Sequence, residues 1–468
     1  MRLNYVYQVD ISSEILEQWR DSDDVLAGTY RLRKKAYKHL PRLDGESEKA
    51  YNTRIEKAVL KNIYKKTLTK AIGNLLKNGL TTNVNIENVD AKGGDLESFI
   101  SRVGVKAAAY GISYVLVDAP FFEGDMNLLE MEMLEFRPYF QIINNLKIEE
   151  IKYITVGSSY TLSYFEYQIV LPDLEGDIRK SYTLGDGFVI WRIEKMGEGD
   201  SRELIDIGVL DIPKIPLVAI YGSPSDYKFI NKPPYLDLAY YNILHFQATS
   251  DSSIAHHVAA TPMLFMRDST SSQRDEQGNL VEREVNISPW SVINTTSQDS
   301  DIRWVETSGQ ALTQHREWLK HIEEDMDELA MNFNLESPDA TATANNLHAA
   351  ENQSGILFIK KELERGVIEI YQIAEEFMNT SITPEFEINA VGIGSLSTEQ
   401  LNSVEIVHDK GLITDEDYVE IINRTLPFDI EYTEPEEPDE PDPTDDEEEE
   451  NQDQENEENQ DSNQEGNE

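Results

Sequence analysis

The chain has 468 residues, of which 39% are hydrophobic, and a formal net charge of −47. This length and apolar content suffice for about two to four folded domains, which excludes a chain that is disordered throughout. The absence of cysteine excludes a disulfide scaffold, a thiolate nucleophile and cysteine-ligated zinc or iron–sulfur sites.

The first 118 residues are predicted to form helices followed by a buried strand. A serine can cap a helix over 12–28, and apolar residues at four-residue spacing predict one long helix over 47–77, with Asn78-Gly79 as its stop. A third helix begins at Asp95. The run 112–118 is apolar and rich in β-branched residues, so we expect a buried strand there.

Residues 153–221 change character. Short alternating runs at 161–170, 188–193 and 217–221 are separated by turns that contain Gly and Asp. This pattern is typical of an antiparallel sheet, and we expect 217–221 to be its last strand. Together with the helices, it predicts an α+β fold.

Two long helices are predicted next, with short strands between them. The first spans about 235–257, and strands are expected within 263–305. The second begins after Gly309 and carries an apolar seam at coiled-coil spacing, so it should pack along its whole length. Its acidic run 323–328 is expected to be the solvated face. The seam consists of Leu312, Leu319, Ile322, Met326, Leu329 and Phe333.

A loop, another long helix and a small helical region complete the chain. The segment 334–344 has small and turn-forming residues and no Lys or Arg, and a long helix follows from about Asn345. A strand at 385–390 precedes two short helices. The loop residues singled out are Asn334, Glu336, Pro338, Asp339, Thr341 and Thr343.

Negative charge is concentrated at the C-terminus. From Glu434 onward there are nineteen Asp and Glu and no Lys or Arg. Such a segment has too little apolar surface to offset its ordering entropy, so we expect 433–468 to be a disordered acidic tail. The rest of the chain still carries about −28. Because tight DNA binding needs basic surface, this chain is not expected to hold DNA tightly, although an acidic lining past which DNA slides is still allowed.

Motifs for catalysis, cofactors and metals are missing. There is no phosphate-binding loop, nucleophile elbow or HExxH zinc helix, and Met1-Arg2-Leu3-Asn4-Tyr5 does not open a signal peptide. No run of about 18 apolar residues predicts a membrane span. His256-His257 are expected to be surface or packing residues. Asp118 is the one candidate Mg²⁺ ligand of a nucleic-acid enzyme, but it serves equally well as a turn residue.

Several segments of the body resemble the portal proteins of tailed bacteriophages, in particular a podovirus- or siphovirus-type group. The resemblance lies in the number and order of the segments. They are Asp24–Gly28, Tyr37–Pro41, Gly45–Ser47, Tyr51–Arg54, Gly111–Pro120, Arg137–Tyr139, Ile212–Leu217 and Gly411–Glu416.

The resemblance implies a division into named parts. The wing would be 1–232 together with the long helix 345–384. The stem would be helices 233–260 and 309–333, with the clip at 261–308 between them. The tunnel loop would be 334–344, the crown 385–432 and the tail 433–468.

The resemblance also implies a role without catalysis or cofactors. Portal rings usually hold about twelve copies at one capsid vertex, where double-stranded DNA enters and leaves. Implied partners are the terminase motor, a head-completion or tail adaptor protein, and the major capsid and scaffolding proteins; assembly would occur in the host cytoplasm and the final location would be the virion. The alternative is another virion component, such as a head–tail adaptor. The expected clip interface comprises Arg267, Arg274, Arg283 and Trp290.

Overall fold

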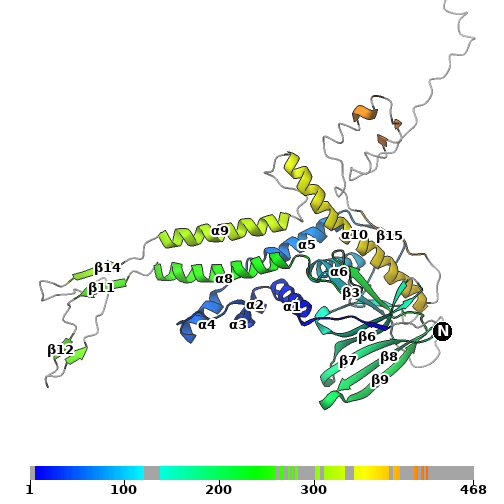
Figure 1. The fold of residues 1–468 in the computed structure, drawn as a ribbon, viewed down its shortest axis with the longest axis horizontal. Coiled ribbons are helices and arrows are strands. Elements are labelled where there is room, and N and C mark those ends of the chain that lie inside the picture. The colour runs from blue at the N-terminus through cyan, green and yellow to red at the C-terminus, as the bar shows by residue number, and fades with distance from the viewer. Residues whose placement is uncertain are drawn as a thin grey trace, which may run out of the picture. The chain divides into compact units, whose positions relative to one another are not determined.

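The structure is a computed structural model that divides into two compact units, Met1–Ser395 and Leu396–Glu468. It describes residues 6–120, 137–157, 159–259, 263–267, 272–274, 277, 280–282, 301–305, 310–331, 342–378 and 383–389. In the second unit it describes 405–408, 410, 413–415 and 418–419. The first unit combines helices with antiparallel sheets and is therefore α+β (Figure 1).

Six helices open the first unit. They are α1 (Ser13–Ala27), α2 (Thr29–Lys34), α3 (Ala36–His39), α4 (Glu48–Lys57), α5 (Ile63–Leu76) and α6 (Leu96–Tyr110). Side-chain caps start several of them: the Ser12 hydroxyl accepts from the Ile15 N–H, as predicted, and Asp95, where a helix was expected to begin, accepts from the Ser98 N–H. The single helix predicted over 47–77 is wrong, because α4 and α5 are separate.

The break between α4 and α5 has a specific cause. Asn62 caps α5 by accepting from the Lys65 N–H at 2.8 Å, and its amide nitrogen donates to the Val25 carbonyl of α1. The Leu60 N–H donates to the Thr29 hydroxyl. These bonds hold the connection between α4 and α5 in an extended conformation. The apolar spacing in the sequence runs on across this break, and Val59, which belongs to that spacing, is exposed.

The larger sheet is antiparallel and has the strand order β1-β5-β6-β7-β8-β9. Its strands are β1 (Val6–Gln8), β5 (Ile148–Val156), β6 (Ser159–Leu171), β7 (Leu174–Leu184), β8 (Val189–Met196) and β9 (Arg202–Leu210). One face supplies Phe165, Tyr182 and Trp191 to the core.

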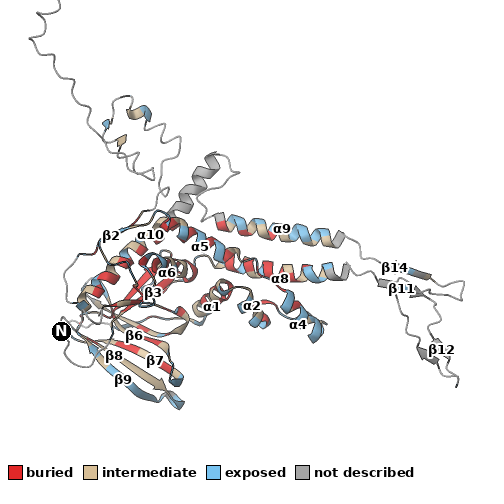
Figure 2. Cartoon of the chain, turned by 180° about the vertical axis from the view of Figure 1, so that it is seen from behind, coloured by how far each residue is buried: buried red, intermediate tan, exposed pale blue. Residues whose placement is uncertain are grey.

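A second sheet lies at the centre of the core. It has the order β10-β3-β4, with β3 (Ile112–Asp118), β4 (Tyr139–Ile143) and β10 (Leu217–Tyr221). The strand 217–221 was expected to end the larger sheet, but it pairs with β3 instead. The reason is burial: β3 is apolar on both faces, so it needs a partner on each edge and cover on each side (Figure 2).

The remaining elements are two further helix-and-strand groups. Helix α8 (Leu236–Ala259) and α9 (Gln310–Met331) contact each other, and between them in the chain β11 (Met263–Arg267) pairs with β14 (Asp301–Val305) and β12 (Ser272–Arg274) with β13 (Leu280–Glu282). Helix α10 (Ala342–Met378) packs on β10 and α6, and β15 (Phe386–Ile388) pairs with β2 (Leu80–Thr82).

Two boundaries differ from the expected ones. Helix α10 begins at Ala342, so Thr343 lies in a helix and not in the loop; the other singled-out loop residues lie outside the described part. The strand 386–388 was grouped with the crown, yet its hydrogen bonds to β2 make it part of the first unit. The acidic tail 433–468 lies outside the described residues.

Substitution of Gly111 is expected to be costly. Gly111 ends α6 with φ +80, and a Cβ there would lie 2.0 Å from the Lys232 carbonyl oxygen. Gly79 has φ +78 but faces open space. We expect Gly79→Ala to lower the free energy of unfolding by about 1 kcal/mol, through backbone strain alone. Gly111→Ala should lower it by about 3 kcal/mol or more, because backbone must also move. If urea denaturation gives the same loss of unfolding free energy for Gly79→Ala and Gly111→Ala, this explanation is wrong.

Candidate assembly site on the paired helices

Helices α8 and α9 form a packed pair (Figure 1). Ile322, Met326 and Ala330 of α9 are buried, and Leu238, Ala239, Phe246 and Ala248 are buried on α8. Of the other seam residues, Leu312 is half-buried, Leu319 and Leu329 are half-buried against the core, and Phe333 lies outside the described residues.

A polar cluster fixes this pair to the body. The Asn242 side chain of α8 accepts from the Tyr64 N–H of α5 and donates to the Lys61 carbonyl, each at 2.9 Å. The Glu323 carboxylate of α9 lies 2.7 Å from the Lys61 ammonium and 3.1 Å from His245 Nε2. We call Lys61, Asn242, His245 and Glu323 the Glu323 cluster. It joins α5, α8 and α9.

Glu323 therefore differs from the solvated acidic residue that its sequence predicts. The hydrogen bond from Lys61 lowers the pKa of the Glu323 carboxyl, with a further contribution from His245. The neighbouring Glu324 pairs only with Lys320 and His321 on its own helix, and Asp327 and Glu328 are exposed. Among the described residues, Glu323 is therefore the member of the acidic run that pairs with another helix.

The helix pair leaves apolar side chains exposed. Tyr240, Leu244 and Ile254 of α8 are 43%, 37% and 38% exposed, and Trp318 of α9 is 44% exposed. On a helix, 240 and 244 lie on one face. Apolar side chains grouped on one helical element often mark an interaction surface.

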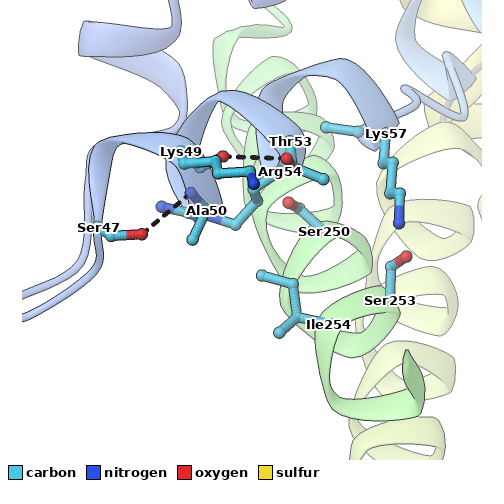
Figure 3. Close-up of a pocket in the computed structure, with 10 residues that line it drawn as sticks. Ser47, Lys49, Ala50, Thr53, Arg54, Lys57, Ser250, Ser253 and Ile254 are labelled. Atoms are coloured by element: carbon cyan, nitrogen blue, oxygen red, sulfur yellow. Dashed lines mark hydrogen bonds between the residues drawn. The ribbon is translucent and has the colours of Figure 1, made fainter. Parts of the chain in front are cut away.

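A cavity of about 340 Å³ lies between α4 and α8. In Figure 3, Lys49, Thr53 and Lys57 of α4 face Ser250, Ser253 and Ile254 of α8. We call this cavity the α4–α8 pocket. Ser250 is 3% exposed, and its hydroxyl has no hydrogen-bond partner among the described residues. A buried hydroxyl without a hydrogen bond lowers the stability of the fold, so a bound group that supplies the hydrogen bond is stabilised there.

The charges around the pocket are of two kinds. Arg54 is buried and paired: its guanidinium donates to Glu46 and to the Pro41 carbonyl and reaches Asp251. The hydrogen bonds from Arg54 lower the pKa of the Glu46 carboxyl. Lys49 and Lys57 are exposed and form no ion pair within the described part of the chain. The rim of the pocket is therefore cationic.

A second cluster, absent from the sequence analysis, lies on α1 and α3. Asp21, Asp24 and His39 are buried, with ligand atoms within 4.8 Å of one another. Lys35 contacts Asp24 at 2.7 Å and Lys38 contacts Asp21 at 2.6 Å. Burial favours a raised pKa of Asp24, but hydrogen bonds from His39 and Lys35 bring it below the ordinary value. Because ammonium groups already neutralise these carboxylates, we assign a structural role.

The structure places the other predicted residues apart from this site. Asp118 pairs with Lys180 at 2.9 Å and accepts from the Ala119 N–H, as a residue ending a strand does. His256 is exposed and its Nδ1 lies 2.8 Å from the Ser252 carbonyl oxygen. Arg267 and Arg274 lie in β11 and β12, without described side chains. Arg283, Trp290 and the side chain of His257 lie outside the described part.

The sequence analysis missed the α4–α8 pocket. Its α4 half is visible as a row of small and cationic residues at 49, 50, 53 and 57, which share one helical face. Nothing in the sequence indicates that this row faces α8. The burial of Ser250 depends on that contact.

A family described as a domain of unknown function (DUF4055) matches residues 234–378, which cover α8, α9 and α10. The search of curated proteins returned no match. Within the described residues, no helix is both long enough and apolar enough to cross a bilayer.

Three solved structures resemble the chain at low identity. A chain of "Neck of empty GTA particle computed with C6 symmetry" has a TM-score of 0.46 at 9% identity, covering 89% of this chain and 95% of that one. "Virion of native gene transfer agent (GTA) particle" gives 0.44 at 10%, with the same coverage. "Neck of native GTA particle computed with C12 symmetry" gives 0.40 at 10%, covering 76% and 88%. No functional conclusion rests on values this low.

Replacement of Asn242 tests the link between α5 and α8. Asn242→Ala leaves the buried Tyr64 N–H without its acceptor, so we expect the free energy of unfolding to fall by about 2 kcal/mol. Asn242→Asp keeps the acceptor for Tyr64 but cannot donate to the Lys61 carbonyl, and it buries a negative charge, so it should lose at least as much. Urea denaturation measures both. A loss below about 0.5 kcal/mol for Asn242→Ala would show that the bond is dispensable.

Proposed function

We propose that this chain is a portal subunit of a tailed bacteriophage or a related particle: copies form a ring at one capsid vertex, and double-stranded DNA passes through the ring. The segment resemblances named above first suggest this role. The structural feature that supports it best is the α8–α9 pair, which projects from the body (Figure 1) and has exposed apolar side chains on both helices. A ring of side-by-side copies would cover these side chains.

The strand module between α8 and α9 suits a docking role in this proposal. In the chain it lies between α8 and α9, and it contains the β11–β14 and β12–β13 pairs. Phe265 is exposed, with the Arg303 guanidinium 5.4 Å from its ring centre. We propose that the terminase motor and later an adaptor or tail protein bind here, through Arg267, Arg274, Arg283 and Trp290.

The DNA path in the proposal follows from charge. The segment 332–341 joins α9 to α10 and contains no Lys or Arg. We propose that it is the part of the ring nearest to DNA. Each lysine or arginine bound to phosphate would have to be released at every step of translocation, so an acidic or neutral lining lets DNA move. No catalytic role is part of this proposal.

Electron microscopy tests the proposal directly. We expect the purified chain at about 10 µM to form closed rings with a central hole and about twelve subunits in negative-stain images, with a matching mass by mass photometry. Truncation after Tyr432 should leave the rings intact, because the removed segment is almost entirely acidic and polar. If the full-length chain stays monomeric or dimeric across salt and concentration, the proposed function is wrong.

The charge of the ring predicts weak DNA binding. With the acidic tail removed, each subunit still carries about −28. We expect fluorescence anisotropy to give a dissociation constant for duplex DNA no tighter than about 10⁻⁵ M at physiological salt, for both full-length and truncated rings. Tight binding with a steep salt dependence in either form would contradict a conduit that DNA slides through.

A further inference from the structure

Trp318 and the α4–α8 pocket fit each other as parts of one interface. Resting on the proposed ring, we propose that the Trp318 side chain of one copy fills the α4–α8 pocket of the next copy. Such a contact uses two different surfaces of the same chain, so every copy gives one tryptophan and accepts one. An interface of this kind closes into a ring when the rotation between copies is right.

The two surfaces lie on opposite sides of α8. Helix α9 contacts α8 on one side and α4 contacts it on the other, in both views of the chain (Figures 1 and 2). At about 100° per residue, Trp318 is about 60° around α9 from the midpoint between the buried Ile322 and Met326. It is therefore on the flank of the seam, where a neighbour standing alongside can reach it.

The two surfaces also lie at the same level along the helix pair. His245 contacts Glu323, which sets the register of α8 against α9. Ser250 lies five residues after His245 on α8, and Trp318 lies five residues before Glu323 on α9. Because the two helices run antiparallel, Ser250 and Trp318 lie at the same height along the helix pair.

This coincidence of level matters for a ring. Copies related by pure rotation about an axis along the helices have no shift along that axis, whereas a shift would give a helical filament. A protruding residue can enter a neighbour's pocket in a closed ring only when both lie at the same level.

The chemistry of the pocket matches an indole ring. Ala50 and Ile254 give it apolar walls, and the buried Ser250 hydroxyl has no partner among the described residues. The indole N–H is a donor only, so in the proposal it donates to the Ser250 oxygen, which the inserted ring must uncover. A cavity of about 340 Å³ is at the small end of ligand pockets and suits one large side chain.

The charges around the two surfaces are complementary. Lys49 and Lys57 lie on the pocket rim, where their ammonium groups can contact the face of an inserted indole ring. Glu317, next to Trp318, is exposed and forms no ion pair within the described residues, whereas Lys320 and His321 pair with Glu324; Arg316 is exposed as well. In the proposal, Glu317 is the neighbour of the tryptophan that contacts the cationic rim. These features favour a second copy of this acidic chain over another occupant.

Assembly of full-length variants tests the proposal. Trp318→Ala should raise the concentration for half-assembly, measured by mass photometry and sedimentation velocity, by about 30-fold or more, equivalent to about 2 kcal/mol. Ile254→Trp, which fills the pocket from within, should do the same. Tyr227→Ala removes an aromatic ring that is 70% exposed and serves as control; it should assemble like the wild type. Thermal unfolding of each variant checks that it is folded.

Mixing the two defective variants separates this interface from others. Trp318→Ala keeps its pocket and Ile254→Trp keeps its tryptophan, so together they can form one good contact and no more. We expect a 1:1 heterodimer from the mixture and mainly monomers from each variant alone.

The outcomes distinguish this inference from the proposed function. If the wild type forms rings and Trp318→Ala forms them equally well, the tryptophan contact is wrong while the portal proposal stands. If the wild type never assembles, both fail. If Ser250→Ala weakens assembly with Trp318 present but not with Trp318→Phe, which lacks the N–H, the predicted hydrogen bond is supported; equal effects in both backgrounds would overturn that bond.

Discussion

The arrangement of this protein depends on the Glu323 cluster. Polar and charged groups of α8, of α9 and of the segment that opens α5 join the helix pair to the body here, and Asn242 is completely buried. Buried polar groups with all partners present fix one geometry, whereas apolar packing alone tolerates sliding by a helical turn. The cluster thus sets both the direction of the helix pair and the register between its helices.

Local patterns predicted most helices and strands, because each depends on neighbouring residues. The apolar run 112–118, the helix starts at Ser12 and Asp95, and the apolar spacing along α9 are of this kind. The errors concern partners far away in the chain. Asn62 interrupts an apolar periodicity through a bond to α1, and β10 pairs with a strand about a hundred residues earlier, so no local pattern indicates either result.

The candidate site divides in the same way. The α9 seam could be predicted from spacing, and Trp318 stands out as a large aromatic residue beside it. The α4–α8 pocket could not be predicted, because its walls come from residues 47–58 and 250–254. The unpaired Ser250 hydroxyl exists only because α4 covers it, and in the sequence Ser250 looks like any helix-surface serine.

Charge sets a condition on any assembly of this chain. Copies that each carry −47 repel one another, and the repulsion acts over a Debye length of about 8 Å at physiological salt. An interface must therefore combine apolar contact with local positive charge. The pocket rim does so, since Lys49 and Lys57 lie beside apolar walls. Because salt screens the long-range repulsion more than the buried apolar contact, moderate salt should favour association, in contrast to a protein that assembles through surface ion pairs.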